Sequence, residues 1–298
     1  DHVQRPQPAS KARTEPGTFL RDRRVDLAMG SKLRQRDTVR RRALGLMAAA
    51  CAVLFVAGGG GFWGRVGRPP ARQGGDGPQP SVEVLLSTFR RDAQGRTAAA
   101  HYSKCACVET VTVLWGDVSR PVAWHLYSSL TKARVHVASS PSLNARFDPD
   151  APLGSSDLLF SVDDDLLVGC SHLASAARIA FHDPTARMVG FHPRLAHAPA
   201  LAPLGRYGGW ITVELFRRYN IVLTKGAFVR PEWLALYWEG AMAPARAMVD
   251  ELHNCEDISM SFAVGNVTGQ GPLWVAGAEL VELGGKGISS DSNHGQMR

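Results

Sequence analysis

Three consecutive aspartates are the residues of this chain that most directly suggest chemistry. They follow an apolar run in the stretch DLLFSVDDDLLVG, residues 157–169. Neighbouring carboxylates repel one another, so the triplet is either solvated on a turn or held by a divalent cation. Hard ions such as Mg²⁺ and Mn²⁺ bind carboxylate oxygens together with substrate phosphates. The elements around Asp163, Asp164 and Asp165 decide between a solvated turn and a metal site.

The segments near the triplet alternate between strand-like and helix-like patterns. Apolar and β-branched runs predict strands at 81–88, 111–117, 133–139 and 157–162, and the stretch after the first strand has helical composition. This alternation predicts an α/β fold with a mostly parallel sheet flanked by helices. Ligands bind such sheets beyond the carboxyl ends of the strands, which is where the triplet falls.

The second half of the chain continues the alternation with one long irregular segment. Residues 192–218 have no clear period, and such segments are usually functional or mobile. The remaining expectations are helices at 171–183 with Ser171 as N-cap, at 231–238 with Pro231 in the first turn, and at 256–267, and strands at 188–191 and 221–228.

The N-terminal part has a different composition from the rest. Residues 1–42 are basic and poor in apolar side chains, which predicts a disordered tail. Residues 43–64 carry no charge, and this run has the length of about 20 residues that a helix needs to span a bilayer. A cleaved signal peptide is the competing interpretation, but the run is long and begins far from the N-terminus. Residues 65–80 are rich in Pro and Gly and predict an extended stem, so the folded domain is expected over 81–298.

The charge distribution predicts topology rather than nucleic-acid binding. The net charge is +7 with a pI near 9.4, and much of it lies in the tail and beside the apolar run. Basic residues before the run place that end in the cytosol and the folded domain in the lumen of the Golgi or endoplasmic reticulum. That compartment permits disulfides among the lumenal cysteines and glycosylation at the Asn266 sequon.

An acidic strand end in an anchored lumenal domain is suited to a nucleotide-sugar transferase. A metal that bridges carboxylate and diphosphate stabilises the departing nucleotide as the glycosidic bond breaks. The motifs that make this hypothesis specific are SLNARF (142–147), SVDDDLL (161–167), MVGFHPR (188–194), YNIVLTKGAF (219–228) and HNCEDISMSF (253–262).

In order and spacing, these motifs resemble the catalytic domain of the exostosin-like glycosyltransferases, from about Ser81 onward. The resemblance implies a GT-A-like fold and transfer of an α-linked N-acetylhexosamine from a UDP-sugar, with Mn²⁺ (or Mg²⁺) and with retention of configuration. It implies that Asp163 contacts the ribose side of UDP and that Asp165 binds the metal, with Asp164 between them. Sequence leaves the acceptor open between a glycan and a glycolipid, the latter favoured by GGKGISS (284–290). A homodimer is also left open.

The resemblance also assigns further nucleotide contacts. Asn144 and Arg146 are candidates for uridine and diphosphate contacts, with an ordinary surface loop as the alternative. Asp117 is expected near the nucleotide with Trp115, for which a core position is the alternative. Relatives have T-Y-D-R after the first strand where this chain has TFRR, so only Arg91 carries over as a nucleotide contact.

Two residues are candidates for the chemical step. Asp257 matches the acid that lies near the anomeric carbon in relatives, where it serves as nucleophile or steadies positive charge in a same-face displacement. Arg298 matches an arginine that faces the diphosphate, which it can bind bidentately. The family continues to a cysteine that pairs with the equivalent of Cys255, so the chain is expected to be incomplete at its C-terminus.

Two other functions fit part of the pattern. A catalytically silent UDP-sugar-binding or scaffold protein would keep the fold without turnover. A metal-dependent nucleotidyltransferase or phosphotransferase shares the acidic strand end but lacks the NCED motif.

Overall fold

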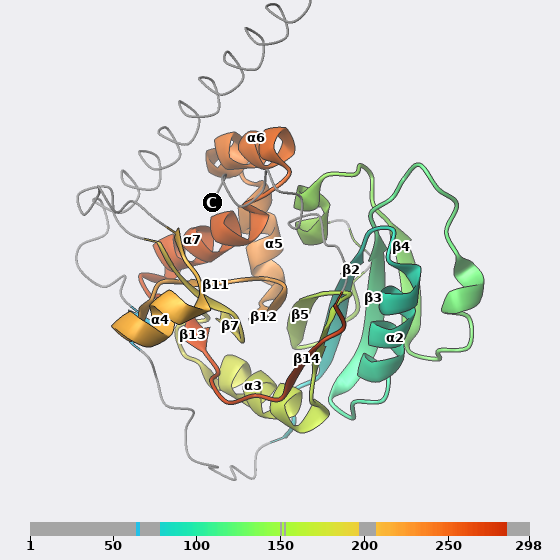
Figure 1. Cartoon of the computed structure of the whole chain (residues 1–298), viewed down its shortest axis with the longest axis horizontal. Helices are drawn as coiled ribbons and strands as arrows, with labels where there is room; N and C mark the ends of the chain where they lie inside the picture. Colours follow the sequence, from blue (N-terminus) through green and yellow to red (C-terminus); the bar gives the residue numbers. More distant parts are fainter. Residues whose placement is uncertain (1–63, 66–77, 150, 152, 197–206, 285–298) are drawn as a thin grey trace, which may run out of the picture. The chain divides into compact units, whose positions relative to one another are not determined.

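The computed structural model describes residues 64–65, 78–149, 151, 153–196 and 207–284 (Figure 1). The predicted tail, most of the predicted anchor and stem, and the segment with Arg298 lie outside the described residues. Among the described residues, no helix is long and apolar enough to cross a membrane.

A seven-stranded sheet in the order β13-β7-β12-β5-β2-β3-β4 forms the centre of the fold. β2, β3, β4 and β5 run parallel to one another, whereas β12 runs antiparallel to both of its neighbours, β5 and β7. The sheet is therefore mixed and mostly parallel, as predicted apart from β12. Its strands are β2 (Val82–Thr88), β3 (Val108–Trp115), β4 (Ala133–Val137), β5 (Leu158–Asp163), β7 (Val189–Gly190), β12 (Gly226–Val229) and β13 (Leu273–Trp274).

Three small sheets complete the strand pairing in the part of the chain that the structure describes. One joins β11, β8 and β9, a second joins β14 to β6, and a third joins β1 to β10. The strands are β1 (Gly64–Arg65), β6 (Leu166–Val168), β8 (Pro193–Ala196), β9 (Tyr207–Gly208), β10 (Arg218–Tyr219), β11 (Ile221–Val222) and β14 (Leu280–Glu282).

Helices cover both faces of the central sheet (Figure 1). On one face, α2 and α3 pack on side chains such as Val84 and Phe160, and on the other, α5 and α7 pack on side chains such as Leu85 and Leu159. Successive residues of a strand point to opposite faces, so both layers exclude water from strands that are apolar on both sides. The helices are α2 (Asp92–Tyr102), α3 (Cys170–His182), α4 (Trp210–Phe216), α5 (Pro231–Trp238), α6 (Ala243–Leu252) and α7 (Glu256–Thr268), with short 3₁₀ turns η1 (Trp124–Leu126), η2 (Leu143–Phe147) and η4 (Gly240–Met242).

A disulfide between Cys105 and Cys170 links the end of α2 to the start of α3. Its sequence separation is 65 residues. A crosslink that closes a long loop restricts the unfolded chain more than a short one does. The disulfide therefore holds together two helices that cover the same face of the sheet.

The structure corrects three expectations for individual elements. The apolar stretch 221–228 is not one strand, because β11 pairs with β8 and β12 pairs with β5, and a turn at Thr224 lets the chain change sheets. Ser171 is not the N-cap of α3: the helix begins one residue earlier, and the Gly169 N–H donates to Glu279 O at 3.0 Å. The described part of 192–218 contains β8, β9 and α4, elements too short to give a sequence period.

The ends of the parallel strands converge on one edge of the sheet. β7 is antiparallel to β12, as β5 is, so β5 and β7 run in the same direction, and β13 is parallel to β7. The residues that follow β2, β3, β5, β7 and β13 therefore meet at a common carboxyl edge. That edge is where a ligand is expected in a sheet of this kind.

Candidate active site

The aspartate triplet lies at the carboxyl edge, as predicted. Asp163 is the last residue of β5, and Asp164 and Asp165 form the turn into β6. Asp164 is fully buried, whereas the side chain of Asp165 is 25% exposed. The turn thus presents one acid to the interior and one toward solvent, which a fully solvated turn would not do.

Arg91 pairs with both acids of the turn, Asp164 and Asp165. It forms ion pairs with Asp164 and with Asp165, the latter at 2.7 Å between Nη1 and Oδ2. Thr88 donates its hydroxyl to Asp164 Oδ2 at 2.7 Å. Burial nevertheless raises the pKa of Asp164 to about 7, with the neighbouring carboxylates adding to the shift and Arg91 and Thr88 opposing it. One guanidinium shared by two acids does not offset the burial of Asp164.

The triplet fits a hard divalent cation. Oδ1 of Asp165 is buried and has no hydrogen-bond donor among the residues that the structure describes. A buried carboxylate oxygen without a donor is a cost that a cation removes. Oxygen donors at a strand end suit Mn²⁺ or Mg²⁺, and Asp165 is the residue best placed to hold either.

A buried arginine joins the triplet to two other predicted motifs. Arg146 on η2 donates from Nη2 to Asp163 Oδ1 at 2.6 Å and from Nη1 to Thr224 Oγ1 at 3.1 Å. The same Nη1 lies 3.7 Å from Glu256 Oε1. Burial acts to raise the pKa of Asp163, but Arg146 overrides it and holds that pKa below its ordinary value. Arg146 therefore fixes the end of β5 against the start of α7.

The acids of the NCED motif form the first turn of α7. Glu256 is buried and its pKa rises to about 7, chiefly through burial, with Arg146 opposing. Asp257 is half-buried, and its Oδ1 accepts a hydrogen bond from the Ile258 N–H at 2.7 Å. Cys255, directly before the helix, has a positive φ of 79°. The geometry separates the two acids. Glu256 is buried against Arg146, whereas Asp257 lies beside the same cluster and is the more accessible of the two carboxylates.

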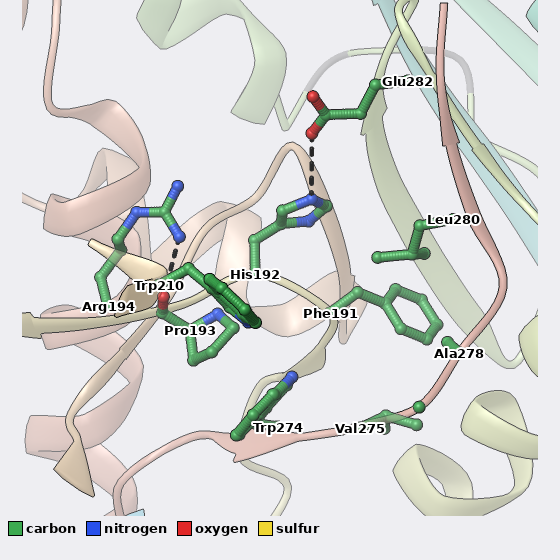
Figure 2. Close-up of a pocket in the computed structure, with 11 residues that line it drawn as sticks. Phe191, His192, Pro193, Arg194, Trp210, Trp274, Val275, Ala278, Leu280 and Glu282 are labelled. Carbon is green, nitrogen blue, oxygen red and sulfur yellow. Dashed lines mark hydrogen bonds and ion pairs between the residues drawn. The ribbon is translucent and has the colours of Figure 1, made fainter. Parts of the chain in front are cut away.

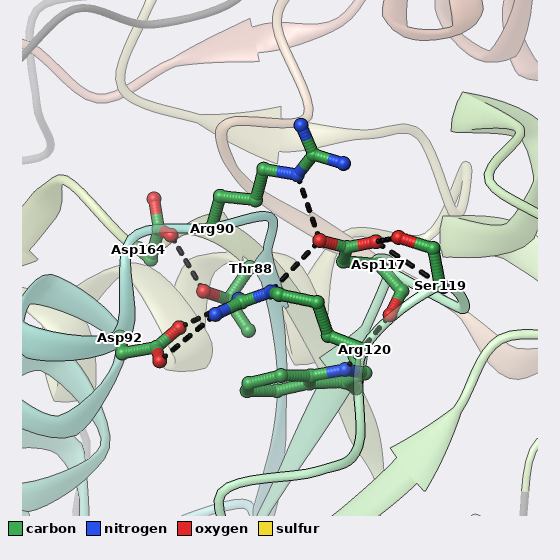
Figure 3. A network of polar contacts seen from close by, with 8 residues as sticks. Thr88, Arg90, Asp92, Asp117, Ser119, Arg120 and Asp164 are labelled. Atoms are coloured by element: carbon green, nitrogen blue, oxygen red, sulfur yellow. Dashed lines mark hydrogen bonds and ion pairs between the residues drawn. The ribbon is translucent and has the colours of Figure 1, made fainter.

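Asp117 anchors a second polar cluster beyond the end of β3 (Figure 3). It accepts from Arg90 Nε at 2.7 Å and from Arg120 Nε at 2.9 Å. Hydrogen bonds from Arg90 and Ser119 hold its pKa well below the ordinary value. Arg120 also pairs with Asp92 at 2.9 Å and lies over the Trp115 ring at 5.2 Å. Two partly exposed guanidinium groups thus stand beside the triplet, where a diphosphate would find positive charge.

Other predicted residues have internal roles. Trp115 is buried and donates to the Asp117 carbonyl at 3.1 Å, so it occupies the core position that was its alternative. Asn144 is buried, donates to Arg246 O at 3.0 Å and accepts from the Tyr237 hydroxyl at 2.6 Å. Its side chain joins η2 to α5 and α6, and its nucleotide contact stays a prediction.

A pocket of about 360 Å³ opens farther along the same edge (Figure 2). Its walls include the aromatic side chains of Trp210 and Trp274, with Arg194 and His192 beside them. Glu282 on β14 lies 3.7 Å from His192 Nε2 and 3.1 Å from Lys225 Nζ. Burial lowers the pKa of His192 to about 4, so the imidazole is neutral at physiological pH.

The pocket and the triplet share their framework. The Asp163 N–H donates to the Lys225 carbonyl at 3.2 Å, and the Leu283 N–H donates to the Asp165 carbonyl at 2.7 Å. The strand β14, which forms one wall of the pocket, pairs with β6 directly after the triplet. A ligand in the pocket would therefore lie beside a ligand held at the triplet.

Sequence reasoning missed several residues of this edge. Arg90 was set aside in favour of Arg91, although the two point to different acids. Arg120 and Trp274 lie outside the motifs, and Thr224 lies within YNIVLTKGAF without having been singled out as a site residue. Arg120 follows β3 and Trp274 is the last residue of β13, and only this place at strand ends could have suggested them. Trp210 lies in the segment without a period, where an aromatic residue gives no local signal.

Comparisons with known proteins agree with this geometry. Residues 82–298 match the family model described as the glycosyl transferase family 64 domain. Glycosylinositol phosphorylceramide mannosyl transferase 1 of Arabidopsis thaliana is 31% identical over 238 residues, which cover 74% of this chain and 70% of that protein.

Two further relatives are matched over shorter stretches. Glucosamine inositolphosphorylceramide transferase 1 of Oryza sativa subsp. japonica is 31% identical over 169 residues, 56% of this chain and 22% of that protein. Exostosin-like 2 of Mus musculus is 26% identical over 200 residues, 64% of this chain and 59% of that protein. The chain thus spans about a fifth of one of these relatives and three fifths of the other. The match over residues 82–298 shows that the chain belongs to glycosyl transferase family 64.

Proposed function

We propose that this glycosyltransferase has a GT-A-like fold and transfers an N-acetylhexosamine or a related hexose from a UDP-sugar to a glycan or glycolipid. The observation that carries the proposal is the position of Arg146. This one buried side chain contacts Asp163 of the triplet and Glu256 of the NCED motif, 93 positions apart in the chain. The donor-binding acids and the candidate catalytic Asp257 therefore belong to a single site.

The donor is assigned to the acidic turn and the arginines around it. A divalent metal held by Asp165 would neutralise the diphosphate as UDP leaves. In this assignment Asp163 and Asp164 line the nucleotide side, with Arg91 and Arg146 setting their charge. Arg90 and Arg120, held by Asp117, supply the positive charge that faces the diphosphate.

Asp257 is assigned to the face of the sugar at which transfer occurs. A retaining reaction needs a carboxylate near the anomeric carbon, as nucleophile or as a stabiliser of developing positive charge. Glu256, which is buried against Arg146, positions the first turn of α7 rather than touching the sugar. Arg298 is assigned to the diphosphate by its motif and lies outside the described residues.

The acceptor is assigned to the pocket lined by Trp210 and Trp274. Aromatic faces with a few convergent polar groups are typical of sites for small polar ligands. Arg194 suits a phosphate, and two of the relatives are named for transfer to inositol phosphorylceramides. The proposed location is a Golgi or endoplasmic reticulum membrane with the catalytic domain in the lumen, and a homodimer is compatible with it.

Release of UDP by the full chain tests the proposal. We expect Mn²⁺-dependent release of UDP from a UDP-sugar that is lost in Asp165→Ala and in Asp257→Ala. Glu232→Ala is the matched control, because Glu232 is an exposed acid in the first turn of α5, after the end of β12 and hence at the opposite edge of the sheet.

Calorimetry of UDP binding separates the remaining outcomes. Asp257→Ala should still bind UDP and Mn²⁺, whereas Asp165→Ala should lose the metal dependence of binding. UDP binding by the parent chain without any release would favour the silent scaffold protein instead.

A further inference from the structure

The helix α4 exposes its apolar side chains. Trp210, Ile211 and Leu215 are 58%, 75% and 74% exposed, although the helix has only seven residues. Val213 alone is fully buried, in a small core with Leu195 and Trp274. A surface helix normally directs its apolar stripe inward, so a contiguous outward set indicates a surface that contacts another apolar phase.

The strand pairing places α4 beside the end of the predicted membrane anchor. β10 begins two residues after α4, and its Tyr219 pairs with Gly64 of β1. The uncharged run of 43–63 ends at the residue before Gly64. Consecutive Cα atoms are about 3.8 Å apart and paired strands about 4.8 Å apart. The strand that follows the predicted anchor in the chain is therefore paired with β10, about 4.8 Å from its backbone.

The polar groups next to α4 suit the surface of a membrane. Arg217 and Arg218 are exposed at its C-terminal end, and Glu214 pairs with Arg217 at 3.0 Å. An arginine can lay its apolar stem along an interface while its guanidinium stays among the polar headgroups. Trp210 fits the same interface, where tryptophan is enriched because its ring is apolar and its N–H is polar.

We propose that the outward face of α4, defined by Trp210, Ile211 and Leu215, rests on the lumenal surface of the bilayer. Trp210 also lines the pocket assigned to the acceptor (Figure 2), so the mouth of that pocket lies at the membrane surface. The acceptor class that follows is a membrane lipid whose polar headgroup enters the pocket. This last step rests on the proposed function, whereas the membrane contact of α4 does not.

A fluorescent probe on α4 tests the contact directly. The full chain carrying Leu215→Cys is labelled with an environment-sensitive dye and reconstituted into vesicles of phosphatidylcholine and phosphatidylserine. The matched control is Trp124→Cys, because Trp124 is 59% exposed and belongs to η1, after β3 and near the opposite end of the sheet order. The parent chain treated with the same dye corrects for labelling of its own cysteines.

We expect the probe at position 215 to shift to the blue and to be quenched by lipids that carry a quencher near the headgroups, whereas the probe at position 124 is not. Equal quenching at both positions, or none at either, would overturn the proposal. A blue shift at position 215 without quenching would also overturn it, since another protein surface would then cover α4.

An activity measurement tests the consequence for the acceptor. The double variant Ile211→Ser/Leu215→Ser should transfer sugar to an inositol phosphorylceramide in vesicles about tenfold more slowly, because less apolar area enters the interface. Its hydrolysis of the UDP-sugar without an acceptor should be unchanged. Unchanged transfer would overturn the lipid assignment. Absence of hydrolysis in the parent chain would instead refute the proposed function and leave the probe measurement valid.

Discussion

Glu83 and Asp164 are both fully buried carboxylates of the same sheet, yet their surroundings differ. Glu83 on β2 accepts from Thr112 Oγ1, from Arg134 Nη2 and from the Gly154 N–H, each at 2.6 Å. Both of its oxygens are thus satisfied within the interior.

Asp164 at the carboxyl edge has less compensation. Its Oδ2 accepts from Thr88, and among the described residues its Oδ1 has only the ion pair with Arg91, which Asp165 shares. Its pKa is raised to about 7, mainly by burial. A buried carboxylate that serves only the fold normally has hydrogen-bond or ion-pair partners for both oxygens. A carboxylate at a strand end with fewer partners indicates a group available for a ligand.

The largest expected effect concerns the outermost acid of the triplet. Asp165→Asn should lower Mn²⁺-dependent UDP release at least about a thousandfold, since a neutral amide supports a metal poorly. Its free energy of unfolding should change by less than about 1 kcal/mol, because the side chain is partly exposed. Steady-state UDP release and thermal unfolding measure the two. Activity within tenfold of the parent would contradict a metal at Asp165.

Substitution of Glu83, whose two oxygens both have hydrogen-bond donors, should affect stability more than activity. Glu83→Gln should lower the free energy of unfolding by about 2 kcal/mol. One accepting oxygen becomes an NH₂ group, which then faces a donor, either Arg134 or the Gly154 N–H. The partial exposure of Arg134 limits the effect. Urea unfolding monitored by circular dichroism measures it, with the exposed Glu109→Gln on β3 as the control. Equal stability of the two variants would show that the hydrogen bonds of Glu83 do not stabilise the fold.

The pH dependence of stability should identify the incompletely compensated acid. The folded state keeps a proton on Asp164 up to about pH 7, whereas the unfolded chain releases it near the ordinary value of 3.8. The folded state then binds more protons between these values, so its stability falls as the pH rises through that window.

The variant Asp164→Asn should lack this contribution of Asp164. Relative to the variant, the parent chain should lose about 1–2 kcal/mol between pH 4 and pH 7, measured without metal. Glu256 has a pKa raised in the same direction, but it is present in both proteins and cancels. A difference that does not vary with pH would show that Asp164 is ionised throughout.

The smallest effect is expected for Arg120, a partly exposed residue at the edge of the proposed donor site. Arg120→Ala should raise the KM for the UDP-sugar about threefold and leave kcat unchanged, since a rim charge contributes about 0.6 kcal/mol to donor binding. The control is Arg96→Ala, because Arg96 is a partly exposed arginine on α2 with a long hydrogen bond of 3.3 Å to Ser129. A fall in kcat would place Arg120 closer to the reacting atoms than the rim.

Local patterns predicted the elements whose hydrophobic signal is continuous. The strands through Val84 and Phe160, and the helices that begin at Pro231 and Glu256, appear where expected because burial on one or both faces leaves a period in the sequence. The antiparallel direction of β12 and the break after β11 left no such signal. Strand direction and sheet membership depend on the chain's path between elements, which composition does not encode.

The sequence by itself determined the class of chemistry: three acids at a strand end, an acid pair in the first turn of a helix, and an uncharged run next to basic residues. Residue type and spacing suffice for this, because carboxylate ligands and apolar spans are local properties. Only the tertiary structure decided that Arg146 ties Asp163 to Glu256, and that α4 exposes its apolar face beside the attachment point of β1. Both depend on long-range contacts, whose partners are set by packing rather than by neighbouring residues.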